Sequence, residues 1–194
     1  MLDKSLPYYN ILMKRQNDVP FFEVSLPNGF SFTKYTSGDE IYWAEIEKSV
    51  GEFKDVHEGL KYFEHHYLPY IGEVSNRVIF LNTSNNEKIG TITAWWNYTG
   101  AFRNLSLHWV AVKPEFQGLG LGRPLINYGI KTLIELDGND DIYVHTQTWS
   151  HTAIAIYLKE GFRFMNIETF GGYRNDFDMA LPFLQEKINL INLL

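Results

Sequence analysis

Three glycines at every second position make Gln117–Gly122 the stretch of this chain with the clearest chemical meaning. It lies between an apolar run that ends before Pro114 and an amphipathic run, as a turn between a strand and a helix would. Glycine lets backbone N–H groups approach a ligand closely, and the first turn of a helix leaves such groups unpaired. The stretch therefore predicts a diphosphate site, and a tight turn that needs only small residues is the structural alternative.

Two common nucleotide motifs do not fit this stretch. Arg123 stands where a dinucleotide fingerprint that begins at Gly118 would have its third glycine. A P-loop would need Gly-Lys-Ser/Thr, which is absent here. A nucleotide-binding redox protein is therefore disfavoured.

The periodicity of apolar residues predicts the elements that position this segment. Strands are expected at 8–14, 30–35, 77–82, 88–98, 105–112, 141–146, 162–168 and 176–181, with 21–26 extended. Helices are expected from Ser37 or Asp39 to Val50 and at 55–67, 121–136 and 152–159. The acidic residues between 40 and 64 are expected on the solvated faces of the first two helices. The apolar tail 183–194 is compatible with a packed helix.

Composition narrows the function classes. The chain has 194 residues, 45% of them hydrophobic, and no low-complexity linker, which favours one α/β or α+β domain. A net charge of −6 without a Lys/Arg-rich block argues against a nucleic-acid partner. The absence of cysteine excludes disulfides and a thiol nucleophile. The sequence has no His-Glu-x-x-His motif, so no metal is predicted. The sequence has no apolar run of the kind that forms a signal peptide or a membrane span, so a cytoplasmic location is expected.

Two blocks of the sequence resemble the GCN5-related N-acetyltransferases, the GNAT family. Gln117–Gly122 matches the family signature Gln/Arg-x-x-Gly-x-Gly/Ala, and Ala153–Phe162 resembles its Ala-x-x-x-Tyr-x-Lys-x-Gly-Phe block. The blocks have the family's usual separation, with a strand between them. The resemblance covers about residues 30–181 and implies an α/β (α+β) fold with a mixed, mostly antiparallel central sheet flanked by helices. The predicted organisation is an N-terminal extension with an extra strand (1–29), the GNAT domain (30–181) and a packed C-terminal tail (182–194).

The resemblance implies an acetyl-CoA-dependent N-acetyltransferase that moves an acetyl group to a primary amine by direct attack in a ternary complex. Its acceptor would be a small-molecule or peptide amine, and homodimers are common in the family. The alternative is a non-catalytic, regulatory acyl-CoA-binding domain. Cofactor contacts are implied for Val110, Ala111, Val112, Gln117, Gly118, Leu119, Gly120, Leu121, Gly122, Arg123, Ser150 and Ala153.

Two residues acquire catalytic roles from the resemblance. Tyr157 matches the tyrosine that protonates the departing CoA thiolate, since a phenol is a proton donor at neutral pH. His108 is the expected base, because some relatives have a histidine there and Ser106 cannot serve. The structural alternatives are a packed helix tyrosine and a buried, hydrogen-bonded strand histidine. Ser150, where many members have asparagine, would cap the following helix or bond to pantetheine.

Overall fold

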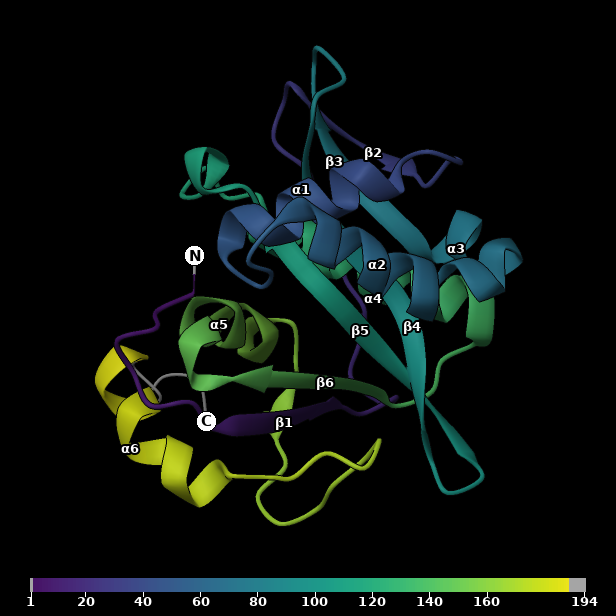
Figure 1. The fold of residues 1–194 in the computed structure, drawn as a ribbon. Helices are drawn as coiled ribbons and strands as arrows, with labels where there is room; N and C mark the ends of the chain where they lie inside the picture. Colours follow the sequence, from purple (N-terminus) through teal and green to yellow (C-terminus); the bar gives the residue numbers. More distant parts are fainter. Residues whose placement is uncertain (1, 189–194) are drawn as a thin grey trace. The chain divides into compact units, whose positions relative to one another are not determined.

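The computed structural model describes residues 2–188, and its strands form one mixed sheet (Figure 1). In these residues the sheet has seven strands in the order β2-β3-β4-β5-β6-β1-β7. The pairs β2–β3, β3–β4, β1–β6 and β1–β7 are antiparallel, whereas β5–β6 is parallel. The expected mixed, mostly antiparallel sheet is therefore confirmed. The strands are β1 (Asn10–Arg15), β2 (Phe30–Lys34), β3 (Val78–Thr83), β4 (Lys88–Thr99), β5 (Phe102–Val112), β6 (Ile142–Gln147) and β7 (Arg163–Phe164).

Helices and short 3₁₀ turns connect these strands (Figure 1). The α-helices are α1 (Glu40–Val50), α2 (Val56–His66), α3 (Ile71–Arg77), α4 (Gly122–Asp137), α5 (His151–Lys159) and α6 (Phe177–Lys187). The 3₁₀ turns are η1 (Leu68–Tyr70), η2 (Pro114–Phe116) and η3 (Thr148–Ser150). Most predicted elements are confirmed within a few residues of their expected ends.

Two strand predictions were wrong. The strand expected at 176–181 is the start of α6, because its buried residues Ala180 and Leu184 follow helical spacing. The strand expected at 162–168 is present only as the two residues of β7. Residues 21–26, expected to be extended, join no strand, and α3 was not predicted. The predicted tail helix 183–194 is confirmed only to Lys187, and residues 189–194 lie outside the described residues. The domain boundaries at 29/30 and 181/182 stay predictions.

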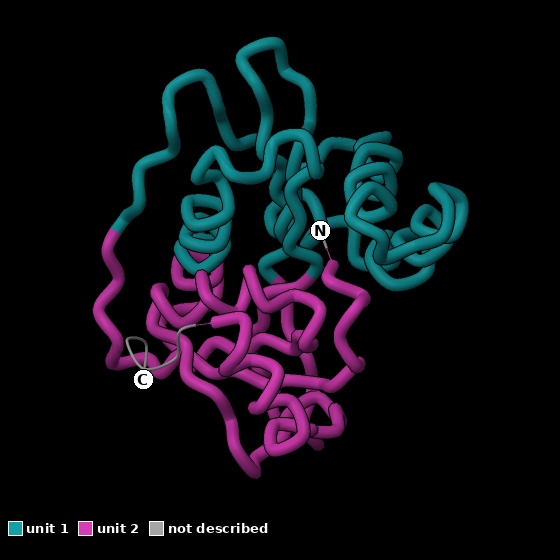
Figure 2. The backbone as a smooth tube through the Cα atoms, turned by 90° about the vertical axis from the view of Figure 1, so that its left-hand side faces the viewer, with its two compact units in different colours: residues 1, 23–94, 109–132 teal, residues 2–22, 95–108, 133–194 magenta. Residues whose placement is uncertain are grey.

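The chain divides into two compact units (Figure 2). Unit 1 contains residues 23–94 and 109–132, and unit 2 contains residues 2–22, 95–108 and the chain from 133 onward. Strands β4 and β5 and helix α4 each contribute residues to both units. Each unit has its own buried core.

The core of unit 1 is formed largely by aromatic side chains between α1 and α2. Trp43 and Phe63 are fully buried, and their ring centroids lie 5.1 Å apart. The two helices approach closely at Gly59, where an added Cβ would lie 3.0 Å from the Cβ of Ala44. Asp55 begins α2 by accepting a hydrogen bond from the Glu58 amide at 2.9 Å. This helix pair therefore holds its aromatic side chains in fixed positions.

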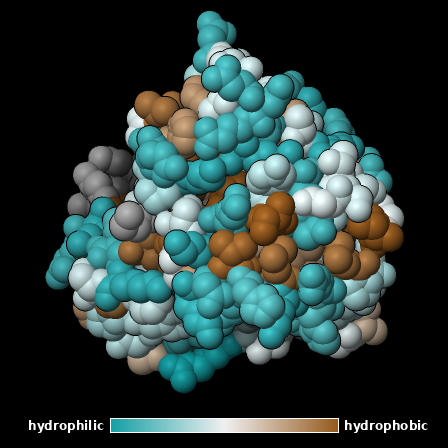
Figure 3. Space-filling view, turned by 45° about the horizontal axis from the view of Figure 1, so that its top comes forward, coloured by the Kyte–Doolittle hydropathy of each residue, from teal (hydrophilic) through white to brown (hydrophobic). Residues whose placement is uncertain are grey.

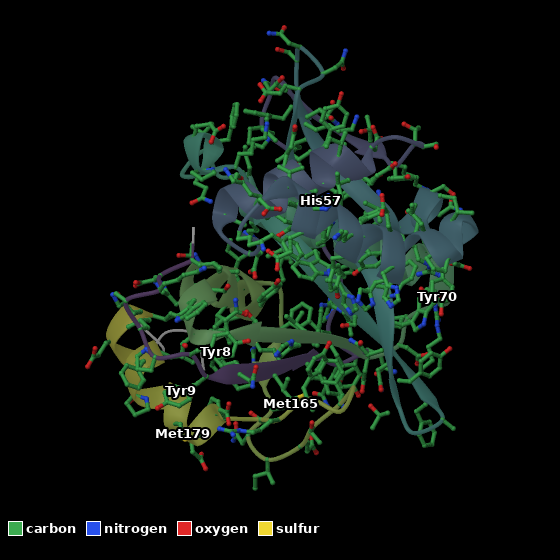
Figure 4. The ribbon with its side chains drawn as sticks, in the orientation of Figure 1. Tyr8, Tyr9, His57, Tyr70, Met165 and Met179 are labelled. Carbon is green, nitrogen blue, oxygen red and sulfur yellow. The ribbon has the colours of Figure 1, made fainter. Side chains whose placement is uncertain are left out.

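The core of unit 2 is built on β1. Ile11, Leu12 and Met13 are all fully buried, and β1 is an inner strand that pairs with β6 along one edge and with β7 along the other. Leu12 packs in a cluster with Phe170 and Met165, which is labelled in Figure 4. A strand with both faces buried is expected to be an apolar run without alternation. The N-terminal strand is therefore an integral part of this core.

We expect Leu12→Ala to lower the free energy of unfolding by about 2–5 kcal/mol, because it leaves a cavity at a fully buried position. The matched control is Leu136→Ala on α4, where the side chain is 42% exposed and the cost should stay within about 0.5 kcal/mol. Urea denaturation followed by circular dichroism measures both. Equal losses in the two variants would contradict the structural role of β1.

Candidate functional site

The glycine-rich segment forms an open loop between η2 and α4 in unit 1. The side-chain amide of Gln117 donates a hydrogen bond to the carbonyl of Val112 at 2.7 Å, which ties the loop to the end of β5. Gly118 and Gly120 have φ angles of 81° and 76°, a region that side chains disfavour. A Cβ added at either position would meet no atom within 4 Å. The loop therefore offers backbone groups to a ligand without obstruction by neighbouring atoms.

Helix α4 begins directly after this loop. The amide of Leu125 donates to the carbonyl of Leu121 at 3.1 Å, and the side chain of Leu121 is only 2% exposed. The buried leucine anchors the first turn, whereas the Arg123 side chain on the same turn is exposed. The positive end of the helix dipole and a guanidinium both suit an anion at this position. These residues fit a CoA diphosphate.

Strand β5 leads into the loop and contains a backbone irregularity at Trp109. This residue has a φ of 50°, in the left-handed region that residues other than glycine rarely adopt. After it, Val110–Val112 continue the strand beside β4, where a Cβ on Gly90 would lie 2.9 Å from the carbonyl oxygen of Ala111. Gly90 thus permits close approach of the two backbones. The expected pantetheine-binding residues lie on this well-fixed strand end.

His108, the last residue of β5 in unit 2, is hydrogen-bonded. Its Nε2 lies 2.9 Å from Nδ2 of Asn97, which also donates to Oγ of Ser106 at 3.3 Å. Because an amide nitrogen donates, Nε2 of His108 accepts, and the ring proton is then on Nδ1. Asn97 was not predicted to contact His108, although the hairpin spacing of β4 and β5 could have suggested it.

Burial keeps His108 uncharged at neutral pH. It lowers the pKa of His108 to about 3, and the nearby His145 contributes to this shift. Burial also lowers the pKa of His145 to about 4, and that ring stacks on Tyr173 with centroids 3.9 Å apart. A general base works best with a pKa near the working pH. The arrangement is that of a hydrogen-bonded strand histidine, and the base role of His108 stays a prediction.

Helix α5, also in unit 2, carries the second sequence block. Tyr157 is 4% exposed, and its ring packs edge-on against Phe162 at 5.4 Å. Ser150 occupies the N-cap position, but its side chain makes no capping hydrogen bond, so the predicted capping role was wrong. Ala153 lies partly buried in the first turn. The roles of these three residues toward a cofactor stay predictions.

One unusual residue in unit 1 was missed by the sequence reasoning. Glu47 was expected on a solvated face of α1, but it is only 1% exposed. Among the described residues, no group forms a hydrogen bond with its Oε1. The signal was present in the sequence, since Glu47 follows Trp43 by four residues and precedes Val50 by three, on the apolar stripe.

Residues 2–188 contain neither a metal-ligand cluster nor a membrane-spanning helix. In this part of the chain, no three histidine, aspartate or glutamate side chains gather as metal ligands would. No described helix combines the length and the apolar character required to cross a bilayer. On the face that Figure 3 shows, hydrophilic side chains surround smaller apolar areas.

Comparison with known proteins agrees with the fold. The family described as "Acetyltransferase (GNAT) family" matches residues 39–162. No curated protein matches the chain. Among solved structures, a GCN5-related N-acetyltransferase from Sphaerobacter thermophilus superposes with a TM-score of 0.62 and 16% identity, covering 82% of this chain and 50% of that one.

Two further structures share the fold. An acetyltransferase of the GNAT family from Colwellia psychrerythraea has a TM-score of 0.58 and 8% identity, with 82% of this chain and 54% of that chain covered. A spermidine N-acetyltransferase chimera from Vibrio cholerae and hSSAT has a TM-score of 0.52 and 18% identity, covering 68% of this chain and 79% of that one. The chain thus spans about half the length of the first two structures. Since the family match covers more than half of the sequence and the sheet order is consistent with it, the chain belongs to the GNAT family of acetyltransferases.

Proposed function

We propose that this protein is an acetyl-CoA-dependent N-acetyltransferase that transfers the acetyl group to a primary amine by direct attack in a ternary complex. The observation that carries the proposal is the open loop Gln117–Gly122 at the start of α4, whose geometry suits the CoA diphosphate. Membership of the GNAT family supports the same reaction class. The absence of cysteine is consistent with direct transfer without a thiol intermediate.

The chain's own residues then have distinct tasks. Gln117 to Arg123 bind the diphosphate, Val110–Val112 pair with the pantetheine arm, and Ser150 and Ala153 border the cofactor. A backbone amide near Val110 donates to the thioester carbonyl and stabilises the oxyanion that forms there. Tyr157 protonates the departing thiolate. The base is not assigned by these features, because burial lowers the pKa of His108 to about 3, which makes it a weak base, and its ring is already hydrogen-bonded to Asn97.

The acceptor is expected to be a small-molecule or peptide amine. One structural neighbour is named for spermidine, and the acidic net charge of −6 is compatible with a cationic acceptor of this kind. A cytoplasmic location, a homodimeric assembly and the absence of nucleic-acid and membrane partners belong to the same proposal. Size-exclusion chromatography with light scattering tests the assembly directly.

Replacing Gly120 with alanine should weaken CoA binding about 5- to 30-fold. Holding alanine at a left-handed φ costs about 1–2 kcal/mol, and each 1.4 kcal/mol changes affinity tenfold. Isothermal titration calorimetry with CoA measures the loss. The matched control is Leu119→Ala, at an exposed side chain of the same loop, which should bind like the wild type. Unchanged affinity for CoA in the Gly120 variant would argue against a diphosphate site at this loop.

Tyr157→Phe should lower kcat about 10²- to 10⁴-fold and leave the acetyl-CoA dissociation constant unchanged. The phenyl ring preserves the packing against Phe162 and removes only the hydroxyl that would protonate the thiolate. Release of CoA during turnover with an amine panel measures kcat. The control is Tyr128→Phe, whose ring packs on Phe32 in unit 1. Wild-type turnover in the Tyr157 variant would refute the acid role of Tyr157. If the wild type binds acetyl-CoA but acetylates no amine, the proposed acetyltransferase activity is refuted.

A further inference from the structure

Glu47 combines burial with an unsatisfied oxygen. Its side chain lies on the apolar face of α1 with Trp43, Ala44, Ile46 and Val50, and it is 1% exposed. No described residue forms a hydrogen bond with its Oε1. Leaving a buried acceptor unpaired destabilises the folded protein, so such a group in a native structure requires an explanation. A ligand that supplies the missing donor would provide one.

A second carboxyl group lies beside Glu47. Helix α1 ends at Gly51, which has a φ of 94°, and the Glu52 amide then donates to the Glu47 carbonyl at 3.1 Å. The exposed Glu52 carboxylate is close enough to act electrostatically on Glu47. Two acidic side chains thus meet where α1 turns toward α2. A positively charged group is the complement of such a pair.

An aromatic cluster connects this turn with β5. The cluster consists of Trp43, Phe53, Tyr62 and Trp109. Trp109 lies at the centre, with centroid distances of 5.3 Å to Trp43, 5.3 Å to Phe53 and 4.9 Å to Tyr62. Trp43 is one helical turn before Glu47, and Phe53 is the residue after Glu52. Aromatic faces attract ammonium groups, so the cluster and the carboxyl pair favour the same kind of ligand.

The backbone at Trp109 strengthens the connection with the reaction. A tryptophan at a φ of 50° is strained, and such strain persists only where the surroundings enforce it. Here the enforced conformation accompanies packing of the indole against the α1–α2 side chains, directly before Val110. Val110 begins the segment proposed to bind pantetheine. The aromatic cluster is therefore adjacent in the chain to the proposed acetyl site.

We propose that Glu47 is the base that removes a proton from the acceptor's ammonium group, which binds beside the aromatic cluster. The inference rests on the proposed N-acetyltransferase function. Ionised Glu47 takes one proton from R–NH₃⁺, directly or through one water, and becomes a carboxylic acid. The neutral nitrogen bonds to the thioester carbon, the C–S bond breaks, and Tyr157 gives its proton to the thiolate. Nitrogen loses its second proton to solvent, and Glu47 and Tyr157 exchange protons with solvent to complete the cycle.

The electrostatic environment fits this role. Burial raises the pKa of Glu47 well above its ordinary value, and the Glu52 carboxylate raises it further. On α2, which packs against α1, burial and the neighbouring His65 lower the pKa of His66, so that ring adds little positive charge at neutral pH. His57, labelled at the start of α2 in Figure 4, is exposed. Since only ionised Glu47 accepts a proton, kcat/KM should fall as pH decreases through its raised pKa.

The test compares Glu47→Gln with the matched control Glu45→Gln, at an exposed position of the same helix, and with His108→Gln, which removes the competing candidate base on β5. Two acceptors are used, propylamine, which is largely protonated at pH 7.5, and O-methylhydroxylamine, whose nitrogen is already neutral. Glu47→Gln should lower kcat/KM about 10²- to 10⁴-fold for propylamine and leave O-methylhydroxylamine unaffected. Glu45→Gln should retain the wild-type ratio of kcat/KM for the two acceptors, and His108→Gln should show no selective loss for propylamine. Equal losses with both acceptors, or a selective loss in the His108 variant instead, would overturn the assignment.

A measurement without turnover separates this inference from the proposed function. Infrared titration of the protein without acceptor should show a protonated-carboxyl C=O band that persists to a higher pH than ordinary glutamate allows. The band should be missing in Glu47→Gln and present in Glu45→Gln. Its absence from the wild type would overturn the inference even if acetylation occurs. If the band is present but the wild type acetylates neither acceptor, the base assignment fails together with the proposed function. Normal CoA binding in that case would still support the diphosphate site at the glycine loop.

Discussion

The close packing of β5 on β4 is the constraint on which the candidate site of unit 1 depends. Gly90 lets the Ala111 carbonyl approach to a distance that any side chain would obstruct, and Lys113 then donates its amide to the Ile89 carbonyl at 2.7 Å. The strand end is thereby held in place. The side-chain amide of Gln117 then ties the glycine loop to this strand end by its hydrogen bond to the Val112 carbonyl. A loop rich in glycine would otherwise be free to adopt many conformations.

The same strand is irregular one residue before its cofactor-binding part. At Trp109 the backbone enters the left-handed region, and the indole packs among the side chains of α1 and α2. Helix packing therefore stabilises a conformation that the strand alone would avoid. In physical terms, the position of Val110 depends on the aromatic core of unit 1 as well as on hydrogen bonds of the sheet.

Burial shifts the pKa values of two candidate bases in opposite directions. Desolvation disfavours the charged form of any group, so it raises the pKa of Glu47 and lowers that of His108. Both groups are therefore held nearer their neutral states. For a carboxyl group this shift moves the pKa toward the working pH, whereas for the imidazole it moves the pKa away. This difference explains why a residue type usually associated with proton transfer is the weaker base here.

Local patterns could predict much of the fold and the position of the glycine loop. The alternating glycines of Gln117–Gly122 and the helical spacing of α4 are properties of short segments, and the structure has both where they were expected. The β1 strand was also recognisable as a short apolar run. Its burial on both faces could not be read from the run, because that depends on residues distant in the sequence, such as Met165 and Phe170, which pack with Leu12.

Long-range packing decided the remaining features. The residues of α6 favoured a strand when read alone, but their burial in the folded chain follows helical spacing. The hydrogen bond of the His108 ring is formed with Asn97, eleven positions earlier, across the β4–β5 hairpin. Trp43, one helical turn before Glu47, packs against Phe63 of α2 and against Trp109, which are distant in the sequence. The amino-acid order alone therefore predicted the glycine loop and its flanking elements, whereas solvent exclusion, and with it the pKa shifts of the candidate bases, arose only when distant segments packed together.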